Sequence, residues 1–471
     1  MSTSTTLPSQ TNTQILIVGA GPTGLVTAIS LAQHGVSPQD ITVVDSLRKG
    51  ENSSRATVIH AGTLEALDAI SSTSVVEILR IGIKGIGEYL TDRHGTPIFK
   101  SSFPVLASYT KYPFFVALSQ AITERILVER AEELGIVVHR PFKVIGMMRN
   151  EEAGGRGRGG GLKVTMESGQ VITTNYVIGA DGAKSMIRES AEISFGDPNH
   201  PGSTAPSDYV HKDLDRMIMA DVSFDPPYPS GIAPDIMAMT PSDKGLFLTL
   251  PLDSDTGRLY GTEDPVYRIG FTIPSDREAP SYATKECIEE YINRQGPYFM
   301  SSDEKLNPSG KSVRIGKVHW SSRFRLRSAV ADTFSKRIGD GIVLLVGDAG
   351  HIHPPAGGQG MNLGIRDSIG LGKVLAEHVK KFGGDYGRES EEFEVGMKKL
   401  EAYAASRRER ALKVIGLTKV LVKAATGVVA SRLFAWGLGM ISMLPLVQKT
   451  AAWNMSGLED KVVDIKDMDA I

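Results

Sequence analysis

The sequence predicts an α/β fold: a parallel sheet with crossover helices, an inserted, mostly antiparallel β-sheet lobe, and helices at the C-terminal end. Strand, glycine turn, helix and strand follow one another over residues 14–45, and parallel strands joined in this way need a crossover helix. From about residue 195 to 325, short strand-like segments alternate with proline, serine and aspartate turns. A strand, a glycine loop and a helical pattern then return over residues 341–378.

This order predicts three units. We expect a discontinuous nucleotide-binding domain formed by residues 1–194 and 326–415, a substrate-binding β-sheet lobe at 195–325, and a helical segment at 416–471. Apolar residues recur at helical spacing in several stretches. The helices that we expect from this spacing cover residues 121–134, 283–293, 391–422 and 428–442.

Composition excludes several classes of function. The chain has 471 residues, 41% of them hydrophobic, and 52 basic residues against 54 acidic ones, so no basic excess points to nucleic acid. Cys287 is the one cysteine, which excludes an internal disulfide and a cysteine-based metal site, and we expect no metal. The polar N-terminal stretch has no signal-peptide core, so we expect a cytoplasmic protein.

One uncharged stretch, residues 433–447, bears on membrane contact. It is shorter than the roughly 20 residues of a spanning helix, and it contains glycine and proline. We therefore expect no transmembrane span and favour helices that pack on the domain. Peripheral membrane contact by residues 411–447 is the alternative, and the sequence leaves open whether the protein is a monomer or a homodimer.

The first motif, Gly19-Ala20-Gly21-Pro22-Thr23-Gly24, lies between an apolar strand-like run and a helical segment. Glycine permits the tight turn and lets the backbone approach a pyrophosphate, which a helix N-terminus favours through its unpaired N–H groups and its dipole. Asp45 ends the next strand, where a carboxylate accepts hydrogen bonds from an adenosine ribose and disfavours a 2′-phosphate. The motif therefore predicts an unphosphorylated adenine dinucleotide, either FAD or NAD.

Two later motifs favour FAD. Gly179-Ala180-Asp181-Gly182 and Gly347-Asp348 each close an apolar strand-like segment, and Asp348 is suited to bind the hydroxyls of a ribityl chain. The stretch Pro354-Pro355-Ala356-Gly357-Gly358-Gln359-Gly360 is a rigid turn followed by backbone that can approach a planar ring closely. A helical pattern begins at Met361, and a helix N-terminus there stabilises the negative charge of a reduced flavin.

With these motifs the chain resembles the single-component, FAD-dependent aromatic hydroxylases typified by para-hydroxybenzoate hydroxylase and phenol hydroxylase. The resemblance covers roughly residues 14–415 and extends to Arg55 and Gln120. It implies that Asp45, Arg55 and Gln120 contact the ribose, pyrophosphate and ribityl regions of FAD. It also implies that the motif of Asp181 serves both FAD and NAD(P)H. The FAD contacts that we expect are Gly19, Gly21, Pro22, Thr23, Gly24, Asp45, Arg55, Gln120, Asp181, Gly347, Asp348, Pro355, Gly358, Gly360, Met361 and Asn362.

The resemblance further implies the reaction. NADPH or NADH reduces FAD, O₂ adds to the flavin, and the resulting C4a-hydroperoxide transfers one oxygen to an electron-rich ring. The oxygen chemistry belongs to the cofactor, and the protein supplies position, dryness and electrostatics. We expect a small-molecule phenolic substrate with an apolar part. Hydroxylation and oxidative decarboxylation of a hydroxybenzoate both fit this machinery. A flavin epoxidase or hydroxylase of a terpenoid or polyketide is an alternative, and a binding module without redox work is a rival from another class.

The catalytic candidates are fewer. His351 follows the third motif, where it would either lie near the flavin or hold the loop by a hydrogen bond, and the family places the counterpart of Pro354 on the reactive face of the flavin. In the lobe, Tyr228 and His211 are the candidates for binding the phenol. Further polar candidates there, each more easily explained as surface or core, are Tyr209, Arg216 and Tyr260. Four methionines at strand alternation predict either plain core or an apolar substrate wall: Met217, Met219, Met237 and Met239.

Overall fold

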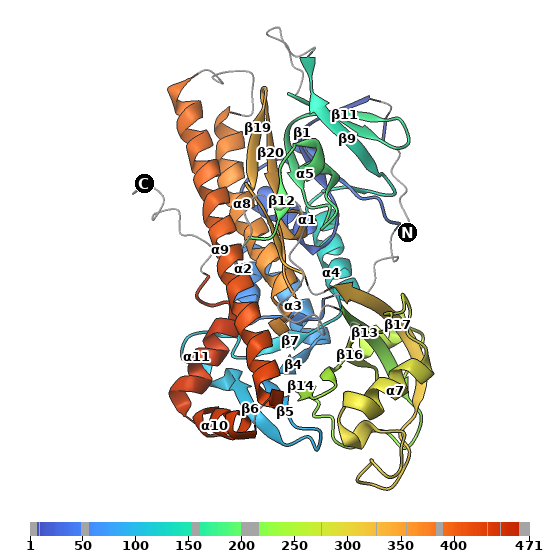
Figure 1. Ribbon diagram of the computed structural model, residues 1–471. Helices are drawn as coiled ribbons and strands as arrows, with labels where there is room; N and C mark the ends of the chain where they lie inside the picture. Colours follow the sequence, from blue (N-terminus) through green and yellow to red (C-terminus); the bar gives the residue numbers. More distant parts are fainter. Residues whose placement is uncertain are drawn as a thin grey trace.

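The computed structural model describes residues 7–8, 10–48, 56–151, 161–198, 216–274, 276–325, 327–354, 356–382, 390–430, 432–442 and 444–460. Figure 1 shows an elongated molecule with one sheet in its upper part and another at the lower right. The long helix α9 (Glu391–Ala430) runs down one side, towards α10 (Arg432–Ser442) and α11 (Pro445–Ser456) at the lower left. The predicted class, an α/β fold with an added antiparallel sheet and C-terminal helices, is confirmed.

The upper sheet has eight strands, and its central ones are parallel. Its main order is β19-β20-β11-β1-β2-β8, and β10 and β9 extend from β11. β1 pairs in parallel with β2 and β11, and β11 pairs in parallel with β20. The strands are β1 (Gln10–Val18), β2 (Ile41–Val44), β8 (Val138–His139), β9 (Val144–Arg149), β10 (Leu162–Met166), β11 (Val171–Gly179), β19 (Ser335–Ile338) and β20 (Gly341–Leu345).

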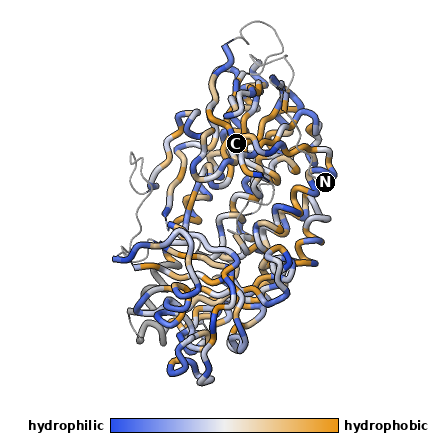
Figure 2. Tube along the Cα trace, turned by 90° about the vertical axis from the view of Figure 1, so that its right-hand side faces the viewer, coloured by the Kyte–Doolittle hydropathy of each residue, from blue (hydrophilic) through white to orange (hydrophobic). Residues whose placement is uncertain are grey.

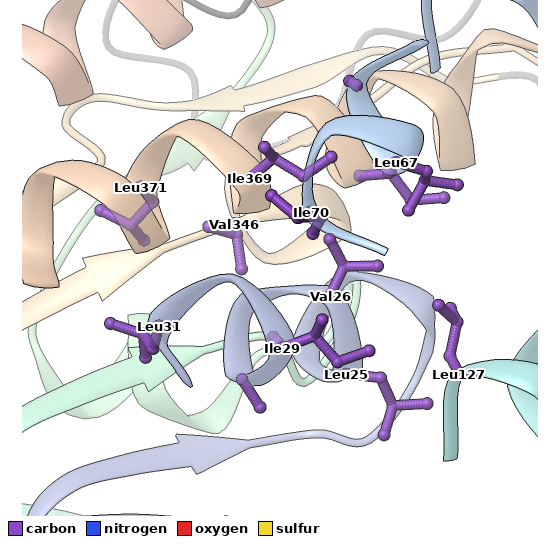
Figure 3. Packing of buried hydrophobic residues seen from close by; sticks show 14 of the residues in the cluster. Leu25, Val26, Ile29, Leu31, Leu67, Ile70, Leu127, Val346, Ile369 and Leu371 are labelled. Carbon is purple, nitrogen blue, oxygen red and sulfur yellow. The ribbon is translucent and has the colours of Figure 1, made fainter. Parts of the chain in front are cut away.

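Two helices dominate the packing beside this sheet. Helix α1 (Pro22–Gln33) lies against α8 (Gln359–Phe382), and Figure 3 shows Val26 and Ile29 of α1 pointing towards Ile369 of α8. All three side chains are buried in the same hydrophobic cluster. The Ser30 hydroxyl donates a hydrogen bond of 2.8 Å to the carbonyl of Ile369, so a buried polar contact also joins the helices. Helix α4 (Gln120–Glu133) contacts α1 as well.

The second sheet has seven strands in the order β17-β13-β16-β15-β14-β5-β6. Its strands are β5 (Gly87–Thr91), β6 (Pro97–Ser102), β13 (Arg216–Phe224), β14 (Ile236–Ser242), β15 (Gly245–Pro251), β16 (Tyr267–Ile273) and β17 (Ile315–Arg325). The predicted lobe, residues 195–325, therefore accounts for only part of the sheet. β5 and β6 come from the segment assigned to the nucleotide-binding domain, because β5 pairs in parallel with β14 and extends that edge.

The two faces of this sheet have different neighbours. Helix α7 (Lys285–Gln295) covers one face, where Ile288 and Ile292 pack with Phe247 and Phe271. On the other face, Met237 belongs to the hydrophobic cluster of the nucleotide-binding part. The register lines up one row across this second face: Phe99, Leu90, Met239, Leu248, Gly270, Met219 and Ser322. This face, which we call the inner face, is therefore the side of the lobe that meets the nucleotide-binding part.

Several expected elements have different bounds. Residues 171–179 form one long strand, β11, which pairs with β1 along its whole length. The helix expected over 391–422 continues to residue 430, and the next helix starts at 432 instead of 428. In Figure 2, hydrophobic and hydrophilic positions are mixed along the helices. Within the described residues, no helix is both long and apolar enough to cross a bilayer.

Candidate active site

The three glycine-containing motifs lie side by side at one edge of the upper sheet. The register of the parallel strands places Val18 opposite Gly179 and Gly179 opposite Leu345. β1, β11 and β20 therefore end at the same edge, and each passes directly into its motif. Crevices outside the carboxyl ends of parallel strands are where α/β folds bind ligands. The convergence that the sequence predicts is present.

The motifs also contact one another at glycines that leave no room for a side chain. Gly19 has a φ of +104°, and a Cβ atom there would lie 2.2 Å from the carbonyl oxygen of Ala180. Gly347 has a φ of +59°, and a Cβ atom there would lie 2.7 Å from Cγ2 of Thr23. Both positions need glycine, because other residues avoid this backbone conformation and would clash. The first motif is thus fixed against the second through Gly19 and against the third through Thr23.

The N-terminus of α1 fits the pyrophosphate of FAD. The helix begins after Gly21, with no side-chain cap and no acidic residue in its first turn. Its first N–H groups therefore have no side-chain acceptor. A Cβ atom on Gly21 would have one protein neighbour within 4 Å, Oε1 of Glu124 at 4.0 Å, so little protein lies over the turn on that side. An uncapped helix N-terminus behind a glycine turn is a site for a phosphate group.

Asp45 is built into the first motif. One carboxylate oxygen accepts a hydrogen bond of 2.6 Å from the backbone N–H of Ala20, and the other accepts one of 2.7 Å from Leu47. Arg140 lies 3.7 Å from the carboxylate and donates to the carbonyl of Ala20 at 2.9 Å. Asp45 therefore fixes the shape of the turn. A carboxylate has about four acceptor positions, so it can still accept hydrogen bonds from a ribose.

The second motif keeps one polar atom unpaired. Oδ2 of Asp181 accepts a hydrogen bond of 3.1 Å from the backbone N–H of Ile187, whereas the buried Oδ1 has no hydrogen-bond partner. Burial raises the pKa of the Asp181 carboxyl, and hydrogen bonds from Ser185 and Ile187 oppose the shift. Arg188 donates hydrogen bonds of 2.9 Å to the carbonyls of Ala349 and Ala183, which ties this motif to the third. An unpaired buried acceptor fits a ligand that donates a hydrogen bond.

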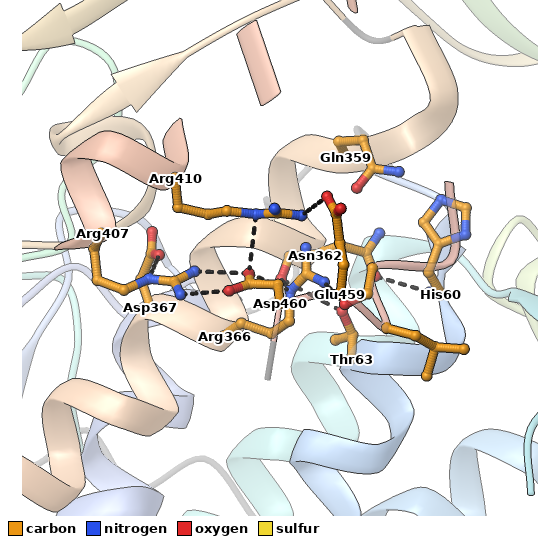
Figure 4. A network of polar contacts seen from close by, with 12 residues as sticks. His60, Thr63, Gln359, Asn362, Arg366, Asp367, Arg407, Arg410, Glu459 and Asp460 are labelled. Atoms are coloured by element: carbon orange, nitrogen blue, oxygen red, sulfur yellow. Dashed lines mark hydrogen bonds and ion pairs between the residues drawn. The ribbon is translucent and has the colours of Figure 1, made fainter. Parts of the chain in front are cut away.

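The glycine loop before α8 is fixed by hydrogen bonds from buried side chains. Gly357 and Gly358 have φ values of +71° and +60°, and no acidic residue follows in the first turn of α8. The Asn362 amide accepts a hydrogen bond from the N–H of His60 at 2.8 Å, and it donates to the carbonyls of Val58 at 2.8 Å and Gly358 at 2.7 Å. Figure 4 shows Asn362 directed towards His60. Asn362, expected as an FAD contact, forms three hydrogen bonds to backbone groups and thereby shapes the loop.

His60 occupies the N-cap position of α2 (Ala61–Ile70), and its Nε2 lies 2.8 Å from the carbonyl oxygen of Gly357. Burial lowers the pKa of His60 to about 4, against the opposing effect of this hydrogen bond. The ring is therefore neutral at physiological pH. This position links the glycine loop to the start of α2.

His351 belongs to a buried ionic network. Its Nε2 donates to Asp367 at 2.7 Å, and Asp367 also accepts a hydrogen bond of 2.7 Å from Arg407. Arg407 in turn forms two hydrogen bonds to Asp460, of 2.7 and 2.9 Å. Figure 4 shows the part of this network that joins α8, α9 and the end of the described chain. Of the two roles considered for His351, this geometry favours the structural one.

The remaining candidates are placed as follows. Pro354 is buried, and its carbonyl lies 2.9 Å from Nδ1 of His353. Gln120, at the start of α4, accepts from the N–H of Ala56 at 3.1 Å, and Asp348 is exposed. Tyr228 lies in the turn after β13 with 45% of its surface exposed. Four of the candidate residues lie outside the described residues: Arg55, Tyr209, His211 and Pro355.

Sequence reasoning missed a buried ion pair on the inner face. Arg268 binds Asp221 through two hydrogen bonds of 2.7 and 2.8 Å, and both residues are 0% exposed. Arg268 also donates to Thr57 at 2.8 Å, which joins the lobe to the nucleotide-binding part. Tyr260, a candidate for binding the phenol, donates to Asp221 at 2.6 Å. The strand alternation of β13 and β16 signals that these residues share a face, but not that this face is buried.

Comparisons with known proteins agree with this arrangement. A family model described as FAD binding domain matches residues 12–259 and 302–415. The rifampicin monooxygenase of Streptomyces venezuelae is 26% identical over 374 residues, which are 78% of this chain and 64% of that protein. The pentachlorophenol 4-monooxygenase of Sphingobium chlorophenolicum is 28% identical over 364 residues, which are 77% of this chain and 58% of that protein. The chain spans less than two thirds of the length of either relative.

Among solved structures, p-nitrophenol 4-monooxygenase from Pseudomonas putida DLL-E4 is similar to this chain with a TM-score of 0.71. The similarity covers 95% of this chain and 98% of that one at 19% identity, so it supports the fold alone. The family model, in contrast, matches most of the chain. The protein therefore belongs to the family described as FAD binding domain.

Proposed function

We propose that this protein is an FAD-dependent monooxygenase that inserts one atom of O₂ into a phenolic small molecule. The observation that carries the proposal is the convergence of three motifs beside the uncapped N-terminus of α1, in the part of the chain that packs against Met237 of the inner face. FAD supplies the oxygen chemistry when it is bound. The relatives named rifampicin monooxygenase and pentachlorophenol 4-monooxygenase support the reaction class.

The chain's own residues would position the reactants. The first N–H groups of α1 would hold the pyrophosphate, Asp45 the adenosine ribose, and Asp348 the ribityl chain. Asp181, with its unpaired Oδ1, would accept a hydrogen bond from a bound nucleotide. Methionine and leucine side chains on the inner face would exclude water from the reacting ring, and exclusion of water strengthens every electrostatic interaction there.

We further propose that NADPH or NADH is the electron donor. The same site could support three reactions: hydroxylation of a phenol, decarboxylative hydroxylation of a hydroxybenzoate, or epoxidation or hydroxylation of a terpenoid or polyketide. The row of the inner face that contains Met219, Met239 and Leu248 favours a substrate with an apolar part. We also propose domain boundaries after residues 194, 325 and 415, and a protein that is a monomer or a homodimer.

The first test is cofactor content. The purified protein is expected to be yellow, with FAD near one equivalent per chain, and to oxidise NADPH or NADH faster when a phenol is added. Mass spectrometry of the product should show a gain of one oxygen, or that gain with loss of CO₂. Purified protein that neither carries nor takes up FAD would contradict the proposal.

A peripheral membrane contact is a separate proposal. The stretch where α10 ends and α11 begins exposes four large apolar side chains: Met440, Ile441, Leu444 and Leu446. Both helices nevertheless pack on the domain, since α10 contacts β6 and α9, and α11 contacts β6. Flotation with liposomes tests this contact: protein that stays at the bottom of the gradient would leave domain packing as the whole role of the segment.

A further inference from the structure

Three buried polar side chains meet where the inner face of the lobe approaches the glycine loop. Glu88 on β5 is directly opposite Ser101 on β6, and Oε1 of Glu88 lies 4.0 Å from Nε2 of His60. Glu88 is 5% exposed, Ser101 is 1% exposed and His60 is 0% exposed. Residues directly opposite each other in an antiparallel pair have neighbouring side chains on one face.

Within the described part of the chain, these side chains leave four polar atoms without a hydrogen-bond partner. They are both carboxyl oxygens of Glu88, Oγ of Ser101 and Nδ1 of His60. Because a carbonyl oxygen only accepts, the contact of Nε2 with Gly357 puts the proton on Nε2 and leaves Nδ1 as an acceptor. Each unpaired buried group destabilises the fold, because it has lost its hydrogen bonds to water and gained none. Such a concentration of unpaired groups indicates a ligand that pairs with them.

The surroundings of the cluster are apolar. The rings of Phe103 and Phe115 lie 6.0 and 6.5 Å from the ring of His60, and Met237 is the neighbour of Glu88 on β14. Burial raises the pKa of Glu88 to about 8 and lowers that of His60 to about 4, so both are uncharged at neutral pH. The charge that acts on His60 comes from Arg366, which donates to Gly457 and lies 3.4 Å from Asp460.

These properties select the chemistry of the ligand. A protonated carboxyl donates one hydrogen bond and accepts others, the imidazole Nδ1 accepts, and the serine hydroxyl does both. A hydroxyl group matches this set, because it also donates and accepts in a small volume. An ionised carboxylate does not, because burying it beside these neutral groups has a large desolvation cost.

We propose that Glu88, Ser101 and His60 form a polar subsite that binds the hydroxyl group of an uncharged phenolic substrate. The inference rests on the proposed function and narrows it: a neutral phenol is the substrate class, and an ionised hydroxybenzoate is not. Its place also follows from the geometry, because His60 contacts Gly357 of the glycine loop while Glu88 and Met237 belong to the inner face. The subsite fixes the ring between these two walls.

The test compares three probes of one shape: 2-naphthol, 2-methoxynaphthalene and 2-naphthoate. Dissociation constants are measured by calorimetry with the purified FAD-containing protein and with its Glu88→Leu and Glu88→Gln variants. The wild-type protein should bind 2-naphthol about tenfold or more tightly than either other probe. Glu88→Leu should remove the preference over 2-methoxynaphthalene, and Glu88→Gln, which still donates and accepts, should keep most of it.

Stability separates this role from a structural one. Leucine removes an unpaired buried carboxyl, so Glu88→Leu should unfold at the same or a higher temperature than wild type while losing the preference. Glu286→Gln, at an exposed position of α7, is the control and should change neither the unfolding temperature nor the preference for 2-naphthol. An unchanged preference in Glu88→Leu, or tightest binding of 2-naphthoate, overturns the subsite; the first result would mean that the cluster binds water only. FAD content, measured on the same samples, reports separately on the proposed function.

Discussion

At the scale of single residues, the site depends on glycines, because a side chain at these positions would keep the loops apart. Gly19 and Gly347 hold positive φ angles, and their missing side chains let three loops approach one another. Thr23 fills the space that remains beside Gly347. The first motif is therefore a packing element as well as a binding element, and substitutions there should affect folding and FAD retention together.

Gly19→Ala tests this point. The added Cβ would lie 2.2 Å from the carbonyl oxygen of Ala180, and the backbone would be strained. We expect the free energy of unfolding to fall by about 2–3 kcal/mol and FAD to be lost during purification. Thermal unfolding and the ratio of flavin to protein absorbance measure both effects.

Gly146→Ala is the matched control. Gly146 lies in β9, and a Cβ atom there would meet nothing within 4 Å. Alanine at such a position should leave FAD content unchanged and stability equal or slightly higher. A Gly19→Ala protein that is as stable and as yellow as this control would show that the close approach of the motifs is dispensable.

Residue patterns predict some of these features and not others. The glycines of the first motif can be predicted from the sequence, because a turn at a helix N-terminus needs them in a fixed order. Glu88 cannot be predicted as a buried residue, because it lies in a five-residue strand where alternation does not say which face is buried. Asn362 has the sequence position of a cofactor contact, but its partners belong to strand β3 (Val58–Ile59) and the loop, which no local pattern reveals.

At the scale of elements, helices α8 and α9 are joined by buried charges. Burial alone would raise the pKa of Asp460, but hydrogen bonds from Arg407 and the charges of Arg407, Arg366 and Arg410 outweigh it and hold the pKa at about 2. Asp367 is also held below its ordinary pKa, by Arg407 and His351, despite its burial. Removing one member of such a network leaves uncompensated charge in the interior.

Asp460→Asn should therefore lower the free energy of unfolding by about 3 kcal/mol at neutral pH. Because the folded pKa of Asp460 is depressed from 3.8 to about 2, its contribution is complete above about pH 4 and is lost as the pH falls towards 2. The wild-type protein should lose about 2 kcal/mol more than the variant over that range. Urea unfolding at a series of pH values measures the difference.

The neighbouring Glu459 provides the control. It is paired with Arg410 at 2.5 Å, but its side chain is 39% exposed. Exposed ion pairs contribute about 0–1 kcal/mol, so Glu459→Gln should have a small effect at every pH. Equal losses in the two variants would mean that the buried network contributes nothing beyond surface charge.

At the scale of the whole molecule, the C-terminal helices belong to the site's support. Gln359, at the start of α8, donates to the carbonyl of Met455 at 2.8 Å, and Arg366 donates to that of Gly457 at 2.7 Å. From the sequence, residues 416–471 are predicted to be a separate helical segment, because helical periodicity does not show which part of the fold a helix packs against. The contacts instead attach its end to the helix that follows the glycine loop.

Deleting the chain from residue 432 onwards should therefore weaken FAD binding, although none of the three glycine-containing motifs is removed. We expect a lower unfolding temperature and a several-fold higher FAD dissociation constant, because α8 loses its contacts with Met455, Gly457 and Asp460. Fluorescence titration of the FAD-free protein with FAD measures the constant. A truncated protein with wild-type affinity and unfolding temperature would refute this coupling.

The order of the strands has a consequence for how the protein is made. β1 is synthesised first, but its neighbour β11 ends at Gly179 and the next strand, β20, ends at Leu345. A ribosome must therefore release most of the polypeptide before β11 has a hydrogen-bonded neighbour on each of its edges. During that interval exposed strand edges invite association between nascent chains. Slower translation at reduced temperature, or abundant chaperones, should raise the yield of recombinant protein that stays in solution.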